Sequence, residues 1–165
     1  MRRLLAAVLI ACLPSLVRAQ APTSSTSAER EAVLATVQKF FDTMAAADVE
    51  GNRSVLAPEG RFFAWQEGKP GSPATVRASS NEEWLKQLAS GKRKLRERMW
   101  NPEVRVHGSI AMVWTPYDFW IDGKFSHCGV DVFNLVRMPD GWKLSGGAYT
   151  VERTGCEPSP LGPLK

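Results

Sequence analysis

The spacing of apolar residues changes once along the chain, from a helical period to a strand period. From Ala28 onward, large apolar side chains recur every three or four residues, at Val33, Val37, Phe40, Phe41 and Met44. This spacing places them on one face of an amphipathic helix. The preceding segment Thr26-Ser27-Ala28-Glu29 has the form of a capping box, which begins such helices. The pattern therefore predicts a helix from Ala28 to about Ala47.

Two shorter helices are predicted from their end signals. Asp48 is a suitable N-cap for a helix over Val49–Leu56, which must end before Pro58 because the residue preceding a proline disfavours helical geometry. Ser80-Asn81-Glu82-Glu83 is a second capping box, and the helix that it begins runs through Leu88 and stops at Gly91. All three helices precede the long strands.

The rest of the chain reads as strands separated by turns. Two strands lie between the helices, at Arg61–Glu67 and Thr75–Ala78. Five more follow the third helix, at Leu95–Trp100, Val104–His107, Ser109–Ile121, Lys124–Met138 and Trp142–Arg153. The connections Gly108-Ser109, Asp122-Gly123 and Pro139-Asp140-Gly141 are typical of hairpins. Helices followed by a long antiparallel meander predict an α+β domain, with helices packed on one face of a curved sheet.

The N-terminal segment differs from the rest in charge and hydropathy. Arg2 and Arg3 precede the apolar run Leu4–Ile10, and small residues lead to Ala19, which is typical of a secretory signal peptide cleaved after Ala19. The run is shorter than the roughly 20 apolar residues of a permanent membrane anchor. An alternative is that Leu9-Ile10-Ala11-Cys12 forms a lipoprotein box with a lipidated Cys12. We favour ordinary cleavage, and expect an exported protein, periplasmic or secreted, that is not attached to a membrane after cleavage.

These boundaries leave one domain. The chain has 165 residues, of which 44% are apolar and 23% charged, close to the average for globular proteins. We expect a signal peptide at 1–19, a flexible polar leader at 20–27, a single domain at 28–156 and a C-terminal tail at 157–165.

Charge gives little support for a nucleic-acid partner. The formal net charge of +4 comes from 21 basic and 17 acidic residues, and three of the arginines lie in the signal segment. The basic run Lys92-Arg93-Lys94, which continues at Arg96 and Arg98, is interrupted by Leu95 and Glu97. A nucleic-acid binder normally has a clustered basic stripe. We therefore interpret this run as a solvated strand edge and expect no nucleic acid to bind.

Export changes what the cysteines can do. Once Cys12 leaves with the signal peptide, Cys128 and Cys156 remain in a compartment where disulfides persist. We expect them to pair, which would stabilise the fold by about 3 to 4 kcal/mol on the chain-entropy argument. The alternative is two unpaired thiols.

The Asp122-Gly123 turn predicts a register for its two strands. If the turn has two residues, Ile121 faces Lys124, and Asp118 lies directly opposite His127. The same face would then carry Trp114, Asp131 and Phe133 beside an open space at Gly129, which describes an aromatic site with two carboxylates and a histidine. Pro116 could mark a bulge that shifts this register.

Among these residues, Asp131 is the best candidate for a polar contact or a general base, because a carboxylate among apolar neighbours needs a partner if it is buried. His127 and Asp118 are further catalytic candidates, although they could equally be a structural cross-strand pair. Tyr149 joins the site if the Pro139-Asp140-Gly141 connection is a three-residue loop with a bulge, and faces away if the loop has two residues.

The chain contains none of the strong catalytic or cofactor motifs. It has no glycine-rich phosphate loop, no HExxH, no CxxC and no Gly-x-Ser-x-Gly. We therefore expect neither a cofactor nor a resident metal; at most, His127 with Asp118 and Asp131 would bind a divalent ion weakly.

Three segments carry a resemblance to a known family over about residues 28–156. They are Gln38-Lys39-Phe40-Phe41-Asp42 with Asp48-Val49-Glu50, the stretch from Asp122 to Asp131, and Gly141-Trp142-Lys143-Leu144. With the order of elements, they resemble the nuclear transport factor 2-like superfamily, and most closely its bacterial putative lumazine-binding (SnoaL-like) proteins. The resemblance implies a cone-shaped curved sheet with the three helices on its concave face, a conical pocket and frequent homodimers.

Three functional hypotheses remain open. The first is an exported protein that binds a small apolar or aromatic molecule in the cone. The second is a cofactor-free isomerase, dehydratase or cyclase, in which Asp131, or His127 polarised by Asp118, moves a proton while Tyr149 or a tryptophan N–H stabilises an oxyanion. The third is a structural dimer without pocket chemistry. A pocket with converging acidic and histidine groups would favour the second hypothesis, and a dry apolar pocket the first.

Overall fold

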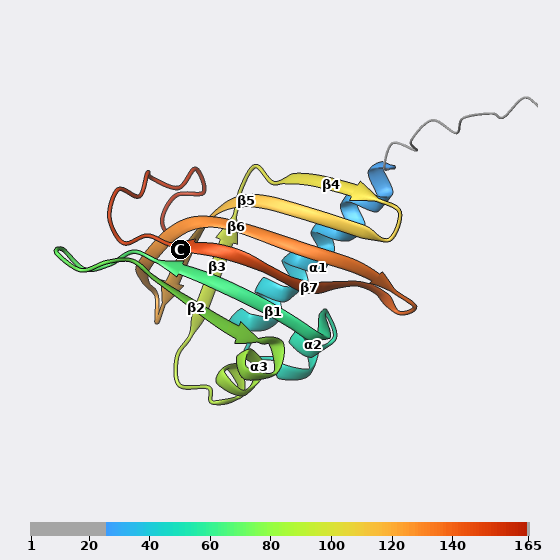
Figure 1. Ribbon diagram of the computed structural model, residues 1–165, viewed down its shortest axis with the longest axis horizontal. Helices are drawn as coiled ribbons and strands as arrows, with labels where there is room; N and C mark the ends of the chain where they lie inside the picture. Colours follow the sequence, from blue (N-terminus) through green and yellow to red (C-terminus); the bar gives the residue numbers. More distant parts are fainter. Residues whose placement is uncertain (1–25, 165) are drawn as a thin grey trace, which may run out of the picture.

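A computed structural model describes residues 26–164 as three helices and seven strands (Figure 1). The predicted signal peptide and most of the leader, including Cys12, lie outside the described residues. In chain order, the elements are α1 (Ser27–Ala45), α2 (Val49–Arg53), β1 (Leu56–Gln66), β2 (Thr75–Ser80), α3 (Asn81–Ala89), β3 (Leu95–Met99), β4 (Glu103–His107), β5 (Ile110–Ile121), β6 (Lys124–Met138) and β7 (Gly141–Val151).

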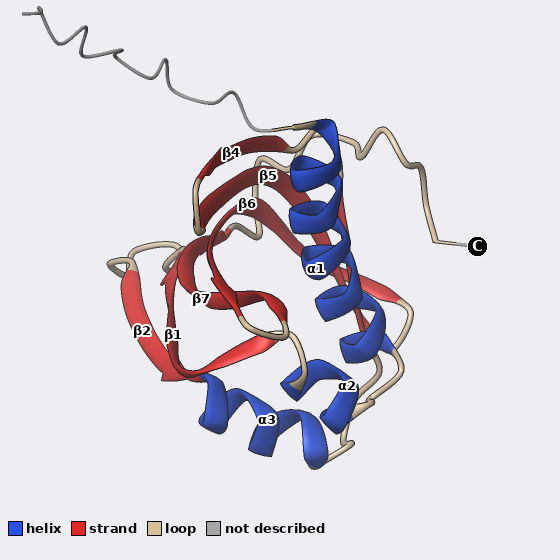
Figure 2. Cartoon of the chain, turned by 90° about the vertical axis from the view of Figure 1, so that its right-hand side faces the viewer, coloured by secondary structure: helices blue, strands red, loops and turns tan. Residues whose placement is uncertain are grey.

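The strands form one curved sheet and the helices lie on its concave side, which confirms the predicted α+β class. Figure 2 shows α1 lying along this side, with α2 and α3 grouped at one end. The strand order is β2-β1-β7-β6-β5-β3, and β4 also pairs with β5. No described helix has the length and apolar character needed to cross a membrane.

The apolar stripe of α1 makes the main core. Val33, Val37, Phe41 and Met44 are almost completely buried. They belong to one cluster with side chains from the inner face of the sheet, namely Val113, Phe133, Leu135 and Leu144. Removal of this apolar surface from water is the main force that holds the helix on the sheet.

The buried Asn52 side chain links the three helices. Its Nδ2 donates to the backbone oxygen of Phe40 at 2.9 Å, and its Oδ1 accepts from Trp84 Nε1 at 2.8 Å. Since Asn52 lies in α2 between these partners from α1 and α3, it fixes the ring of Trp84 and closes one end of the cone.

Most of the sheet is the predicted antiparallel meander, with one exception. β1 pairs with β7 in the parallel direction, and β1 is five residues longer at its start than the predicted strand. The N-terminal hairpin β1–β2 therefore joins the sheet beside the last strand. The hairpin signals could not predict this, because no turn connects β1 to β7.

The register between β5 and β6 differs from the prediction. Ile121 faces Lys124, as expected for the two-residue turn, but the register shifts between Phe119 and Trp120. Ser126 is the extra residue, so Phe119 faces His127 and Asp118 faces Cys128. This bulge, and not one at Pro116, places Asp118 and His127 on opposite faces of the sheet.

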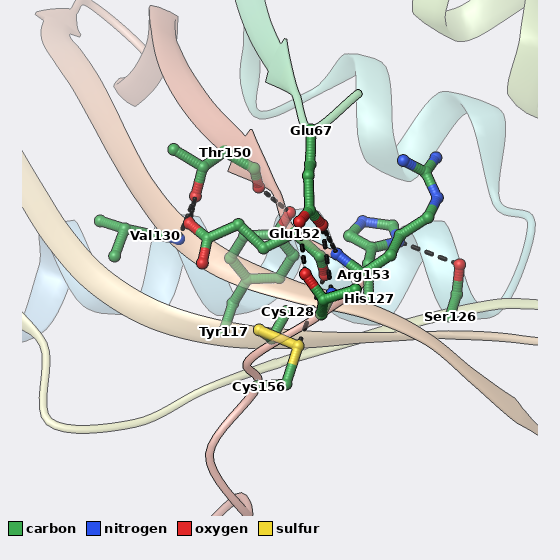
Figure 3. Close-up of a disulfide and its surroundings, with 11 residues drawn as sticks. Glu67, Tyr117, Ser126, His127, Cys128, Val130, Thr150, Glu152, Arg153 and Cys156 are labelled. Atoms are coloured by element: carbon green, nitrogen blue, oxygen red, sulfur yellow. Dashed lines mark hydrogen bonds between the residues drawn. A yellow bond between two sulfur atoms is a disulfide. The ribbon is translucent and has the colours of Figure 1, made fainter. Parts of the chain in front are cut away.

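A disulfide joins Cys128 to Cys156, which confirms the predicted pair. The disulfide ties the C-terminal tail to the middle of β6. An isolated antiparallel β-bridge, which pairs the backbones of Cys128 and Glu152, extends the sheet at this point. Glu67 also holds the start of the tail, because its carboxylate accepts from the backbone nitrogens of Arg153 and Thr154 (Figure 3). The end of β7 is therefore held from both sides.

Candidate functional site

A cavity of about 330 Å³ lies between the helices and the concave face of the sheet. Its walls are largely aromatic and aliphatic, including Phe40, Phe62, Trp84, Phe119 and Phe133. A few polar side chains point into it, from strands that are far apart in the sequence. A mostly apolar concave site with a small number of convergent polar groups is the usual form of a small-molecule pocket.

Two carboxyl groups, which we call the acid pair, line this cavity: Glu97 on β3 and Asp131 on β6. Asp131 is only 3% exposed, and its Oδ2 atom has no hydrogen-bond partner within the described residues. Burial raises the pKa of Glu97 well above its ordinary value, and the negative charge of Asp131 raises it further. Burial also raises the pKa of Asp131, although a hydrogen bond with Glu97 opposes that rise.

The acid pair therefore holds a proton at pH values where exposed carboxyl groups have lost theirs. Two adjacent carboxylates in an apolar site cannot both be charged without a large electrostatic cost, so one proton is shared between them. Such a pair can accept a hydrogen bond and donate a proton from the same location, which is what acid–base chemistry requires.

Two tyrosines stand beside the acid pair. Tyr149 on β7 is the register partner of Asp131, and burial raises the pKa of Tyr149. Tyr117 on β5 is almost completely buried, and its hydroxyl donates to the backbone oxygen of Thr150 at 2.5 Å. Burial, followed by the charges of Asp131 and Glu97, raises the pKa of Tyr117 far above its ordinary value, so that it stays neutral.

His127 forms another part of the wall. Its ring stacks on Phe119 with centroids 4.9 Å apart, and its Nδ1 lies 3.0 Å from the hydroxyl oxygen of Ser126. Burial, together with the positive charge of Arg153, lowers the pKa of His127 to about 4. The imidazole is therefore neutral at physiological pH and can accept or donate a hydrogen bond.

Four of the six residues predicted for the pocket line the cavity: His127, Asp131, Phe133 and Tyr149. Neither of the two predicted loop lengths by itself explains how Tyr149 reaches the cavity. The Pro139-Asp140 turn has two residues, with Met138 facing Gly141, and a register shift between Asn134 and Leu135 then brings Tyr149 opposite Asp131.

The other two predicted residues, Asp118 and Trp114, do not lie in the cavity. They occupy alternate positions on β5 whose side chains point away from those of Tyr117 and Phe119. Trp114 is 37% exposed, whereas Asp118 is buried and binds Arg98 through two hydrogen bonds. Asp118 therefore cannot polarise His127, and the weak ion site formed by Asp118, His127 and Asp131 is wrong.

Glu97 and Tyr117 belong to the site but were missed. The interpretation of the basic run as a solvated strand edge leaves Glu97 out of the site, and the unshifted register turns the face of Trp114 and Asp118, and not that of Tyr117, towards His127. A signal for Glu97 was present in the sequence: in the run Leu95–Met99, Leu95, Glu97 and Met99 alternate with the two arginines, and this period of two places Glu97 on the apolar face.

The described residues contain no group of three or more histidine, cysteine or acidic side chains arranged to hold a metal ion. The acid pair, the two tyrosines and the neutral histidine of this cavity suit hydrogen bonding and proton transfer to an organic molecule.

Comparisons with known proteins place this fold. The profile of the family described as "Putative lumazine-binding" matches residues 28–150. No curated protein matches the sequence.

Similar solved structures include a protein of unknown function with a cystatin-like fold from Nostoc punctiforme, with a TM-score of 0.63, 12% identity and coverage of 84% of this chain and 99% of that one. Another is described as a putative dehydratase from the NTF2-like family from Streptomyces avermitilis, with a TM-score of 0.58, 21% identity and coverage of 75% and 96%. An NTF2-like protein from Cytophaga hutchinsonii gives a TM-score of 0.63, 16% identity and coverage of 74% and 98%. These likenesses establish the fold.

Proposed function

Since the chain belongs to the putative lumazine-binding family and has the nuclear transport factor 2-like fold, we propose that it binds a small, partly apolar molecule in the cavity. The observation that carries the proposal is the cavity itself, with aromatic walls and a buried Asp131 oxygen that has no hydrogen-bond partner among the described residues other than Glu97. An apolar ring system would replace water along these walls, and the few polar groups would fix its orientation.

The proposal includes export. The disulfide between Cys128 and Cys156 is compatible with an oxidising compartment, where such bonds persist. The N-terminal pattern supports the same location. The ligand would then be taken from the periplasm or from the medium.

A pair of tryptophan variants on β2 tests the binding function. Ser79 lines the cavity, whereas its neighbour Ala78 points to the other face and is exposed. We expect protein purified from its native host to release a bound small molecule on denaturation, detected by mass spectrometry. The Ala78→Trp protein should carry the same molecule, and the Ser79→Trp protein should have lost it. Equal occupancy in both variants would contradict binding in this cavity.

A second function, proton transfer without a cofactor, is favoured by the acid pair. A carboxyl group of raised pKa beside a neutral histidine and two tyrosines fits an isomerase, dehydratase or cyclase. In this mechanism, Asp131 takes a proton from carbon adjacent to a carbonyl group, and Tyr149 donates a hydrogen bond to the developing oxyanion.

Hydrogen exchange at carbon tests this second function. The probe is 2-tetralone in D₂O, whose acidic C1 hydrogens disappear from the proton NMR spectrum as they exchange. We expect the wild-type protein to accelerate the exchange at least about a hundredfold over buffer. Asp131→Asn should abolish the acceleration, and Ala78→Trp should retain it. Equal rates with wild type and Asp131→Asn would leave ligand binding as the function of the cavity.

A further inference from the structure

Three exposed arginines line the cavity, and we call them the arginine rim. Arg77 lies on β2, Arg93 between α3 and β3, and Arg153 immediately after β7. All three side chains are exposed, in contrast to the buried carboxyl of Asp131. They come from three separate segments of the chain, so the fold brings three positive charges to one cavity.

The positive charge of the rim is only partly neutralised. Arg93 binds Asp122 at 3.2 Å in an exposed ion pair, whereas Arg77 and Arg153 make no ion pair with any described residue. The nearby carboxylates have other partners: Glu67 accepts from the backbone of Arg153 and Thr154, and Glu83 caps α3.

Two cavity groups respond to the rim, which places the arginine charges within electrostatic reach of the interior. Arg153 contributes to the lowered pKa of His127. Arg77 lowers the pKa of Tyr149 and so opposes the effect of burial. Both arginines therefore act on side chains that line the cavity wall.

The arginines favour an anionic group on the ligand, whereas the buried end of the cavity requires a hydrogen-bond donor. Apart from the proton that Asp131 shares with Glu97, the Oδ2 atom of Asp131 accepts no hydrogen bond from any described residue, in a position that is 3% exposed. A buried carboxyl oxygen that is short of donors costs free energy, so a ligand that supplies an N–H or O–H group gains that energy on binding. Tyr117 cannot supply the donor, because its hydroxyl hydrogen is already given to Thr150.

We propose that the ligand is an aromatic or alicyclic acid whose anionic group lies at Arg77 and Arg153 and whose opposite end donates an N–H or O–H hydrogen bond to Asp131. This inference rests on the proposed function, since it specifies the chemistry of a molecule bound in the same cavity. The aromatic walls between the two ends hold the ring body. A carboxylate and a phosphate are both compatible with arginine, which binds either through paired hydrogen bonds.

Four naphthalene probes test the two ends separately: 6-hydroxy-2-naphthoate has both groups, 2-naphthoate only the anion, 2-naphthol only the donor, and 2-naphthyl phosphate a different anion. Binding is measured by quenching of tryptophan fluorescence and by calorimetry. We expect 6-hydroxy-2-naphthoate to bind about tenfold more tightly than 2-naphthoate or 2-naphthol, as one additional hydrogen bond to a charged group implies. Comparison of 2-naphthoate with 2-naphthyl phosphate shows which anion the rim prefers.

Variants test which residues are responsible for each increase in affinity. The double variant Arg77→Gln/Arg153→Gln should weaken binding of all three anionic probes about tenfold and leave 2-naphthol unchanged. Asp131→Ala should remove the advantage that the hydroxyl group gives. The control is Arg105→Gln, which removes an exposed arginine on β4 that does not line this cavity. It should bind all four probes as the wild type does.

The outcomes separate this inference from the function on which it rests. If 2-naphthol and 6-hydroxy-2-naphthoate bind equally well, and the arginine variant changes neither, the cavity binds apolar molecules but the acid specificity is overturned. If none of the four probes binds to the wild-type protein, both the acid specificity and the proposed function fail.

Discussion

Asp131 and Glu97 share a proton because two adjacent negative charges in the apolar cavity would have a large electrostatic cost. In the unfolded chain, both carboxyl groups are hydrated and ionise near their ordinary pKa values. Folding raises both pKa values, so the folded state binds more protons than the unfolded state above about pH 4. By linkage, the free energy of unfolding must fall as the pH rises through this range.

Replacing Asp131 by asparagine should remove much of this pH dependence. The amide has the same shape and cannot ionise, so we expect Asp131→Asn to be more stable than wild type at pH 8 by about 1 to 3 kcal/mol. At pH 4 the two proteins should be similar. Urea unfolding between pH 4 and pH 9 measures the difference. A stability difference that does not depend on pH would show that Asp131 loses its proton normally in the folded protein.

At acidic pH, His127 should have the opposite effect, so that the free energy of unfolding rises with pH. Its pKa falls from an ordinary value of 6.5 to about 4 on folding, so the unfolded state binds more protons between these values. Its contribution to stability is present above pH 6.5 and is lost as the pH falls towards 4. Because the ring is only partly buried, we expect a loss of at most about 2 kcal/mol.

The variant His127→Asn tests this contribution, because asparagine retains a polar side chain but does not titrate. We expect the slope of unfolding free energy between pH 6.5 and pH 4 to be smaller in His127→Asn than in the wild type. His107→Asn is the matched control, since that exposed histidine lies on β4, away from the cavity. If His107→Asn flattened the profile and His127→Asn did not, the assignment would be wrong.

At the level of elements, the sequence predicts the starts of the helices well because the N-caps carry local signals, whereas α2 ends at Arg53, before the predicted Leu56, which begins β1. Thr26 and Ser80 accept from the third residue of their helices, as the two capping boxes predicted. The Asp122-Gly123 turn was also correct. The bulge at Ser126 was not predictable in this way, because an extra residue in a strand has no turn chemistry of its own. This one extra residue places Asp118 and His127 on opposite faces of the sheet.

The disulfide is the element-scale feature with the largest expected effect on stability. The double variant Cys128→Ser/Cys156→Ser should be less stable by about 2 to 5 kcal/mol. It should also release the tail, whose residues pack beside Trp120 and Phe125 and whose Gly162 oxygen accepts from Arg98 at 2.8 Å. Guanidinium unfolding and limited proteolysis measure the two effects. The oxidised wild type treated with a reductant is the control, and unchanged stability in both would contradict a structural role for the bond.

For the whole molecule, the N-terminal prediction concerns the mature chain. We expect protein recovered from the exported fraction to begin at Gln20, because small residues precede that position and the apolar run extends past Cys12. N-terminal sequencing and intact-mass measurement test this. A lipid-modified Cys12 would support the lipoprotein alternative, and protein confined to the cytoplasm with its first nineteen residues intact would contradict export.

Homodimer formation also stays a prediction. An apolar depression on the outer face of the sheet includes Phe63, Trp65 and Val76, which are 47%, 41% and 68% exposed. Exposed apolar groups of this size often mark an interface. We expect light scattering to give the mass of two chains and Trp65→Lys to give that of one. A wild-type protein that is monomeric at high concentration would contradict the dimer.

The parallel pairing of β1 with β7 also determines when the cavity can form during folding. The cavity wall includes residues of β1 and of β7, yet nearly half of the chain separates these strands in sequence. No N-terminal fragment that ends before Gly141 can give β1 this neighbour. Contacts between such distant segments are slow to form, because a long loop must be closed first. The binding site therefore matures late, after the last strand has joined the sheet.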